Sequence, residues 1–113
     1  NEIEEAEKAF QRALTMDGRY SDAVLAYAMF MVDGGREREA IDLMLEYLEV
    51  YQDAVLLYGV VAVHLLCGKR KVALEYLNEA LKRYYDANEL LSEFYPEMEG
   101  DDEIKVIFRL YRP

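Results

Sequence analysis

Two segments of this chain, Asp22-Ala-Val-Leu-Ala-Tyr27 and Asp53-Ala-Val-Leu-Leu-Tyr58, are near-copies of each other. A second pattern accompanies them: a small residue, a larger apolar residue four positions on, and another residue three positions later. It occurs three times, at Ala6, Phe10 and Ala13-Leu14, at Ala40, Met44 and Tyr47-Leu48, and at Ala73, Leu77 and Ala80-Leu81. The alanines that open the pattern stand 34 and 33 residues apart. Self-similarity at this period predicts a solenoid of stacked helical hairpins.

Inside each unit the apolar residues follow helical spacing. Ile41, Met44, Leu45 and Leu48 lie at i, i+3, i+4 and i+7, which is typical of an amphipathic helix. Seven helices are predicted, at residues 2–16, 21–33, 37–50, 54–67, 70–84, 87–94 and 101–111. The apolar runs 24–32 and 54–67 also resemble buried strands, but their length, their alanines and the repeat favour helices.

Turn and cap residues separate the predicted helices. Turns are expected at Asp17-Gly18, Gly34-Gly35 and Gly68. The expected N-caps are Ser21 or Asp22, Asp53, and Asp86, which would form a capping box with Glu89. Near the C-terminus, Pro96 is expected to stop one helix and Asp101 to cap the next. That last helix carries one apolar face of Ile104, Ile107, Phe108 and Tyr111.

Composition restricts the classes of protein that are possible. Hydrophobic residues make up 53% of the 113 residues and charged residues 32%, which fits one globular domain. A net charge of -10 disfavours nucleic acid as the main partner, and it more often serves solubility than function. The single cysteine excludes an intrachain disulfide. No apolar run is long enough for a membrane span. The chain opens inside a helical pattern, so we expect a piece of a longer protein.

The period and the small-x-x-x-large pattern resemble the signature of the tetratricopeptide repeat (TPR), in which a helix A pairs with a helix B. The resemblance covers residues 2–84. It implies a lone helix B at 2–16 and full repeats at 21–50 and 53–84. The family's tryptophan is missing, and its closing proline is replaced by Gly18, Gln52 and Tyr85.

The remaining residues, 86–112, resemble the closing segment of many bacterial TPR proteins, a shortened helix A followed by a capping helix. Such a cap covers the stacking face that the last repeat of a solenoid would otherwise expose. The resemblance implies an all-α, right-handed TPR solenoid of antiparallel helix pairs, with about two and a half repeats and C-terminal capping helices.

In TPR proteins the A helices line a concave groove that holds a partner's peptide. The resemblance places nine residues of this chain there: Asp22, Leu25, Ala26, Met29 and Val32 from one repeat, and Asp53, Leu56, Leu57 and Val60 from the next. The lysine, arginine and asparagine with which one TPR subclass clamps a C-terminal carboxylate are absent at these places. The expected groove is therefore an apolar strip with acidic ends, either open to a partner or covered by the tail or by neighbouring repeats of a tight superhelix.

Few side chains of this sequence are candidates for metal binding or catalysis. His64 and Cys67 lie at i, i+3 on one predicted helix, but no other histidine or cysteine exists to complete a metal site. Both are expected in or beside the core. No glycine-rich phosphate loop and no serine elbow occur. We therefore expect no enzyme activity, no cofactor and no metal.

One basic patch interrupts the acidic chain. Lys69, Arg70 and Lys71 form it, with Lys82 and Arg83 at the end of the same helical region. The patch has two explanations, a site for an acidic peptide or an ordinary solvated turn.

The predicted function is that of a protein–protein interaction scaffold for a protein or peptide partner. The alternative is a structural module for self-association or intramolecular docking, without a peptide ligand. A homodimer is expected through the first helix, whose apolar face would pair with a second copy. That face consists of Ile3, Ala6, Phe10, Ala13 and Leu14.

Overall fold

The computed structural model describes residues 2–15 and 20–113, and these residues form helices and no strand. The elements in chain order are α1 (Glu2–Thr15), α2 (Tyr20–Asp33), α3 (Glu37–Val50), α4 (Ala54–Leu66), α5 (Arg70–Tyr84), the 3-10 helix η1 (Tyr85–Ala87), α6 (Glu89–Phe94), the 3-10 helix η2 (Pro96–Gly100) and α7 (Asp102–Tyr111). All seven predicted helices are present, and residues 24–32 and 54–66 are helical. The predicted Asp17-Gly18 turn lies outside the described residues.

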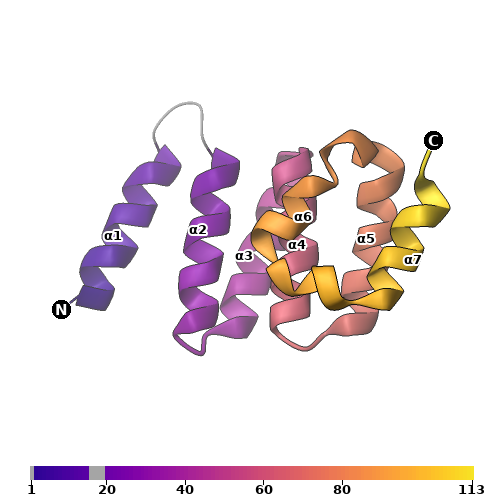
Figure 1. The fold of residues 1–113 in the computed structure, drawn as a ribbon. Helices are drawn as coiled ribbons and strands as arrows, with labels where there is room; N and C mark the ends of the chain where they lie inside the picture. Colours follow the sequence, from indigo (N-terminus) through magenta and orange to yellow (C-terminus); the bar gives the residue numbers. More distant parts are fainter. Residues whose placement is uncertain (1, 16–19) are drawn as a thin grey trace.

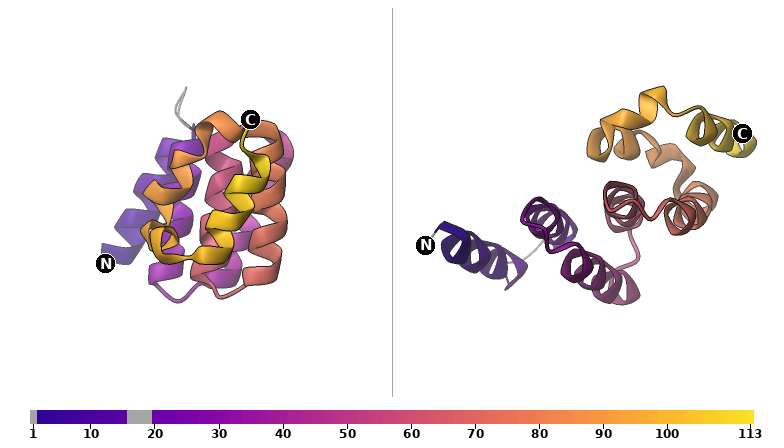
Figure 2. Two further views of the ribbon diagram at one scale, coloured as in Figure 1. Left: turned by 45° about the vertical axis from the view of Figure 1, so that its right-hand side comes forward. Right: turned by 90° about the horizontal axis from the view of Figure 1, so that it is seen from below.

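Figure 1 shows the helices side by side, with α1 and α7 at opposite ends of the array. α4 is the central element, since it packs against α2, α3, α5 and α6. Seen from below, the helices follow a curve, with α2, α4 and α6 on its inner side and α3, α5 and α7 on its outer side (Figure 2). The predicted all-α helical solenoid is confirmed.

Two aspartates begin helices as predicted. The Leu56 N–H donates to the Asp53 carboxylate over 2.8 Å at the start of α4, and the Ile104 N–H donates to Asp101 over 3.1 Å at the start of α7. Each bond satisfies a backbone donor that has no partner within the helix.

The other predicted caps are wrong. α2 already begins at Tyr20, so Ser21 and Asp22 lie within its first turn. Asp86 lies inside η1, which continues the chain directly from α5, and α6 begins only at Glu89. The capping box of Asp86 and Glu89 therefore does not form.

Glycines permit the two described turns between long helices. Gly35 and Gly68 have φ angles of 79° and 73°, in the left-handed region where a side chain is strained. Each glycine lies two residues after the end of one helix, in the turn that joins it to the next. The turn reverses the chain, so the next helix runs back along the first.

α4 is buried on all sides. Every residue from 56 to 65 is buried, because four helices surround this segment. One face of α4 joins a cluster with α2 and α3, and the other joins a cluster with α5, α6, η2 and α7. Gly59 allows the first contact to be close: a Cβ atom at this position would lie 2.9 Å from Met44 Cε and 3.0 Å from Leu25 Cδ1. A helix with no exposed face needs the uniformly apolar sequence that α4 has.

α1 packs on α2, and Phe10, from the face that we expected to bind another copy, takes part in this contact. The Phe10 ring stacks on Tyr27 with 5.2 Å between the ring centroids, and it lies 5.4 Å from Phe30. The Tyr27 hydroxyl also donates to Glu7 over 2.7 Å. Phe10 is thus engaged within its own chain, which corrects the expectation for this residue. Ile3, with 59% of its surface exposed, remains accessible.

Candidate protein-binding surface

Four of the nine predicted groove residues lie in the core, which corrects their assignment. Leu56 and Val60 are fully buried, and Leu25 and Leu57 are nearly so. No partner segment can contact them without the array opening. The physical reason is the packing around α4, since Met29 of α2 and Phe94 of α6 both pack against the two buried clusters to which α4 contributes.

Asp53 has a structural role. Its carboxylate accepts from the Leu56 N–H and also from the Ser21 hydroxyl. The side chain therefore links the first turn of α2 to the first turn of α4. These two bonds use about half of the acceptor positions of the carboxylate inside the protein.

The other groove residues form an accessible strip on α2. Asp22 and Ala26 are exposed, and Met29 and Val32 are half-buried. Asp22, Ala26 and Met29 lie at i, i+4 and i+7, so they share one face, opposite the buried Val24 and Ala28. Val32 turns toward the core cluster with α3 and α4.

Asp33 extends the strip and was missed by the sequence analysis. It is exposed, and it follows Met29 by four residues on the same face. Its spacing could have identified it. We call Asp22, Ala26, Met29 and Asp33 the α2 strip. The strip has an apolar centre and a carboxylate at each end, about 16 Å apart along the helix.

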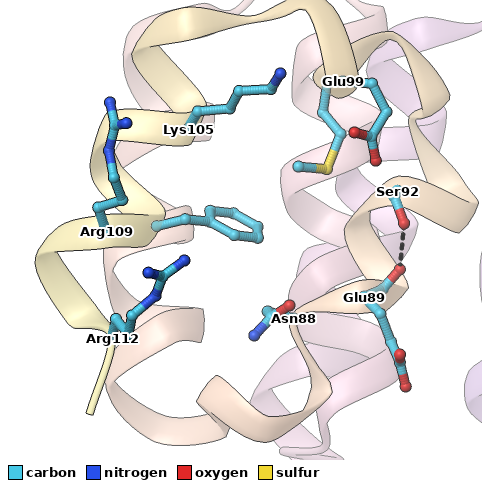
Figure 3. Close-up of a pocket in the computed structure, with 9 residues that line it drawn as sticks. Asn88, Glu89, Ser92, Glu99, Lys105, Arg109 and Arg112 are labelled. Carbon is cyan, nitrogen blue, oxygen red and sulfur yellow. Dashed lines mark hydrogen bonds between the residues drawn. The ribbon is translucent and has the colours of Figure 1, made fainter.

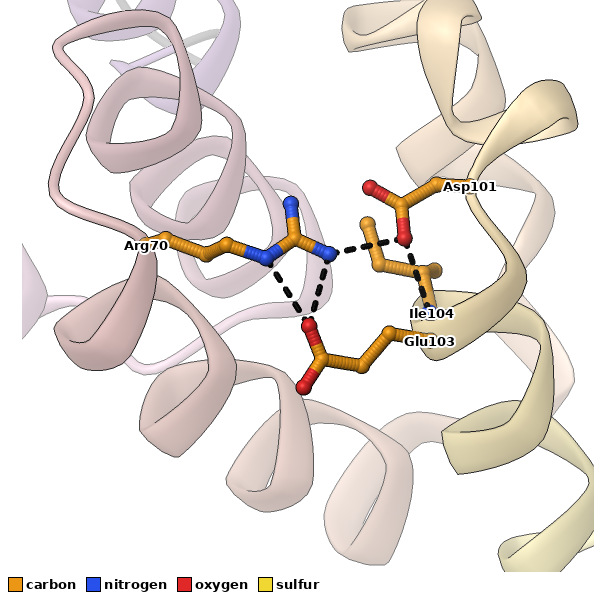
Figure 4. A network of polar contacts seen from close by, with 4 residues as sticks. All are labelled: Arg70, Asp101, Glu103 and Ile104. Carbon is orange, nitrogen blue, oxygen red and sulfur yellow. Dashed lines mark hydrogen bonds and ion pairs between the residues drawn. The ribbon is translucent and has the colours of Figure 1, made fainter.

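The basic patch is partly occupied by the chain's own tail (Figure 4). The Arg70 guanidinium lies 2.7 Å from Asp101 Oδ1 and 2.8 Å from Glu103 Oε1. The two carboxylates raise the pKa of Arg70, and the Arg70 hydrogen bond lowers the pKa of Asp101. The acidic segment at Arg70 is therefore that of α7, which this contact holds against α5.

The other basic residues of this region differ in their contacts. Arg83 donates to the Gln52 side chain over 2.8 Å, while Lys69, Lys71 and Lys82 are exposed. The predicted site for an acidic peptide at Lys69, Arg70 and Lys71 thus lacks a free arginine, the residue best suited to bind a carboxylate in a bidentate way.

His64 and Cys67 do not form a reactive pair. His64 is buried in α4, and its Nδ1 donates to the Val60 carbonyl over 2.7 Å. Cys67 is half-buried at the end of α4, where burial raises the pKa of its thiol to about 11. A thiol with this pKa is protonated at neutral pH and is a poor nucleophile.

The part of the chain that the structure describes contains neither a metal-binding cluster nor a membrane-spanning helix. No cluster of histidine, cysteine and carboxylate side chains is placed to hold a metal ion. None of the described helices combines the length and the apolar character that crossing a bilayer requires.

Comparison with known proteins supports the repeat architecture. A family model described as tetratricopeptide repeat matches residues 1–63, more than half of the chain. Anaphase-promoting complex subunit 7 of Dictyostelium discoideum is 31% identical over 108 residues, or 96% of this chain. The chain spans 17% of the length of that relative. No solved structure matches the chain significantly.

These matches leave two expectations as predictions. The relative comes from Dictyostelium discoideum and gives no support to a bacterial source. The division into a lone helix at 2–16, repeats at 21–50 and 53–84, and a cap at 86–112 is untested.

Proposed function

Because the chain belongs to the tetratricopeptide repeat family, we propose that its α2 strip holds a segment of a partner protein. Repeats of this family generally mediate protein–protein interactions. The relative from Dictyostelium discoideum is, by its name, a subunit of a complex. A scaffold function within a protein assembly fits this kind of relative.

The exposure of Ala26 beside Met29 carries the proposal. Both are apolar, and they lie between Asp22 and Asp33 on one helix face. α2 lies on the inner side of the curved array (Figure 2). A partner segment there would bury an apolar side chain against Ala26 and the adaptable Met29 thioether. Basic residues on either side of it would face the two carboxylates.

One substitution tests this surface. Ala26→Arg adds a long cation to the centre of the strip, where it would block an apolar side chain. Ala9 on α1 is also an exposed alanine, so Ala9→Arg is the matched control. The full chain and both variants are immobilised, exposed to cell extract, and the retained proteins are quantified by mass spectrometry.

We expect wild type and Ala9→Arg to retain the same proteins and Ala26→Arg to lose them. Circular dichroism should show equal helical content in all three, because both alanines are exposed. If Ala26→Arg retains the same proteins in the same amounts, the α2 strip is not the binding surface.

The alternative function is self-association without a peptide ligand, and the oligomeric state of the purified chain distinguishes it from the scaffold function. Light scattering of the purified chain at high concentration distinguishes a monomer from a dimer. Burial of Phe10 against Tyr27 and Phe30 leaves the first helix with less apolar surface for such a contact.

A further inference from the structure

The α6–α7 hollow, a cavity of about 360 Å³, lies between α6, η2 and α7. Figure 3 shows the hollow from close by. α7, which forms one of its sides, lies at the end of the array opposite α1 (Figure 1). A cavity of this volume is in the range of sites that take a small ligand or one or two side chains of a partner.

One wall of the hollow is basic. Lys105, Arg109 and Arg112 of α7 line this wall. In Figure 3, Lys105 and Arg112 extend toward the opening, whereas the Arg109 guanidinium points along the outer side of α7. Their spacing of four and then three residues places them on one helix face over about 10 Å. All three are exposed, and within the described residues none of them forms an ion pair.

The opposite wall offers hydrogen-bond acceptors. The Asn88 amide already donates to the Tyr85 carbonyl over 2.6 Å, and the Ser92 hydroxyl donates to the Glu89 carbonyl over 2.8 Å. Their oxygens therefore remain available to accept. The exposed carboxylates of Glu89 and Glu99 line the same side (Figure 3).

Apolar atoms complete the hollow. Met98 of η2, which is 6% exposed, and the half-buried Phe108 of α7 both line it. Both residues also belong to or pack against the core cluster of the C-terminal half. The hollow therefore offers an apolar contact at a fixed position between two walls of different polarity.

We propose that the α6–α7 hollow binds a protein segment that carries an acidic side chain next to a large apolar one. The carboxylate pairs with the cations of α7, backbone N–H groups of the segment donate to the α6 wall, and the apolar side chain covers Met98 and Phe108. A bare phosphate satisfies only the α7 wall and is repelled by Glu89 and Glu99. A polypeptide presents acceptors and donors together, so it matches both walls.

The inference rests on the proposed scaffold function and adds a second surface with opposite charge preference. The α2 strip favours a partner with basic flanks, whereas the α6–α7 hollow favours an acidic one. The two surfaces lie on different helices, so each can be removed by substitution without changing the other.

The test is a selection from a displayed library of random short peptides on the full chain. Selected peptides are synthesised with a fluorophore, and their affinity is measured by fluorescence anisotropy. Arg109→Glu and Lys105→Glu reverse a charge in the hollow. Lys8→Glu makes the same change at an exposed lysine of α1. Circular dichroism checks the fold, and the second hollow variant serves if the first is misfolded.

We expect the selected peptides to share an acidic residue beside an apolar one. Each hollow variant should weaken their binding at least about tenfold, since a charge-assisted bond is replaced by repulsion. Lys8→Glu and Ala26→Arg should bind them like wild type, and inorganic phosphate should not displace them.

Three results would overturn the inference: no peptide whose binding depends on Arg109 or Lys105, displacement by phosphate, or stronger binding when the acidic residue is replaced by lysine. These failures leave the α2 strip untouched, because that surface is tested by Ala26→Arg and retention from extract. Conversely, if Ala26→Arg does not change retention from extract, the peptide affinities measured for the hollow still stand.

Discussion

The burial of Leu56 can be tested by truncation, because α4 contains a matched leucine that is partly exposed. Leu56 is 0% exposed in the centre of the array, whereas Leu66 at the end of α4 is 41% exposed. Leu56→Ala removes buried methyl and methylene groups worth about 0.8 kcal/mol each and leaves a cavity. We expect a cost of about 3–5 kcal/mol for Leu56→Ala and about 1 kcal/mol or less for Leu66→Ala, where water fills the space.

Thermal unfolding followed by circular dichroism measures both variants. A domain of this size loses about 4 °C in Tm per kcal/mol, so Leu56→Ala should lower Tm by about 12–20 °C and Leu66→Ala by about 4 °C or less. The total stability of a chain of this length is roughly 6–17 kcal/mol, so both variants should still fold at room temperature. If Leu56→Ala and Leu66→Ala lower Tm equally, Leu56 is not buried, and it could then face a partner as the sequence predicted.

Two further predictions concern the tail and the cysteine. Arg70→Gln should accelerate amide hydrogen exchange in α7, because the ties to Asp101 and Glu103 are lost, while Lys71→Gln should not. The Arg70 contact depresses the pKa of Asp101; its contribution is present above the unfolded pKa of about 3.9 and is lost as pH falls through the lower folded pKa. Acid should therefore release α7 in wild type and change little in Arg70→Gln. Cys67, with a thiol pKa of about 11, should react with iodoacetamide more slowly at pH 8 than the same thiol in urea. Equal rates would contradict its burial.

Most of the α2 strip could be predicted from the sequence, whereas the α6–α7 hollow could not. Asp22, Ala26 and Met29 followed from the resemblance, because the A helices of the family line the concave groove. Lys105, Arg109 and Arg112 gave no signal that distinguishes them from solvated charges. Their significance depends on Glu89, Ser92 and Met98, which only the packing of η2 against both α6 and α7 places opposite them.

The sequence by itself determined where the helices lie. Periodicity, glycine turns and the caps Asp53 and Asp101 act over a few residues, so they can be recognised without knowledge of distant contacts. The repeat of Ala40 and Ala73 also marks where helices approach closely, and both alanines are fully buried. Local rules were therefore sufficient for the fold class.

Only the tertiary structure decided that α4 has no accessible face between residues 56 and 65. Its sequence is apolar on every side, so periodicity cannot separate a surface facing a partner from one facing the core. The answer depends on α6, about thirty residues further along the chain, which packs on α4 and places Phe94 against both buried clusters. Burial is a property of what covers a residue, and the covering helix is not encoded in the pattern of the helix that it covers.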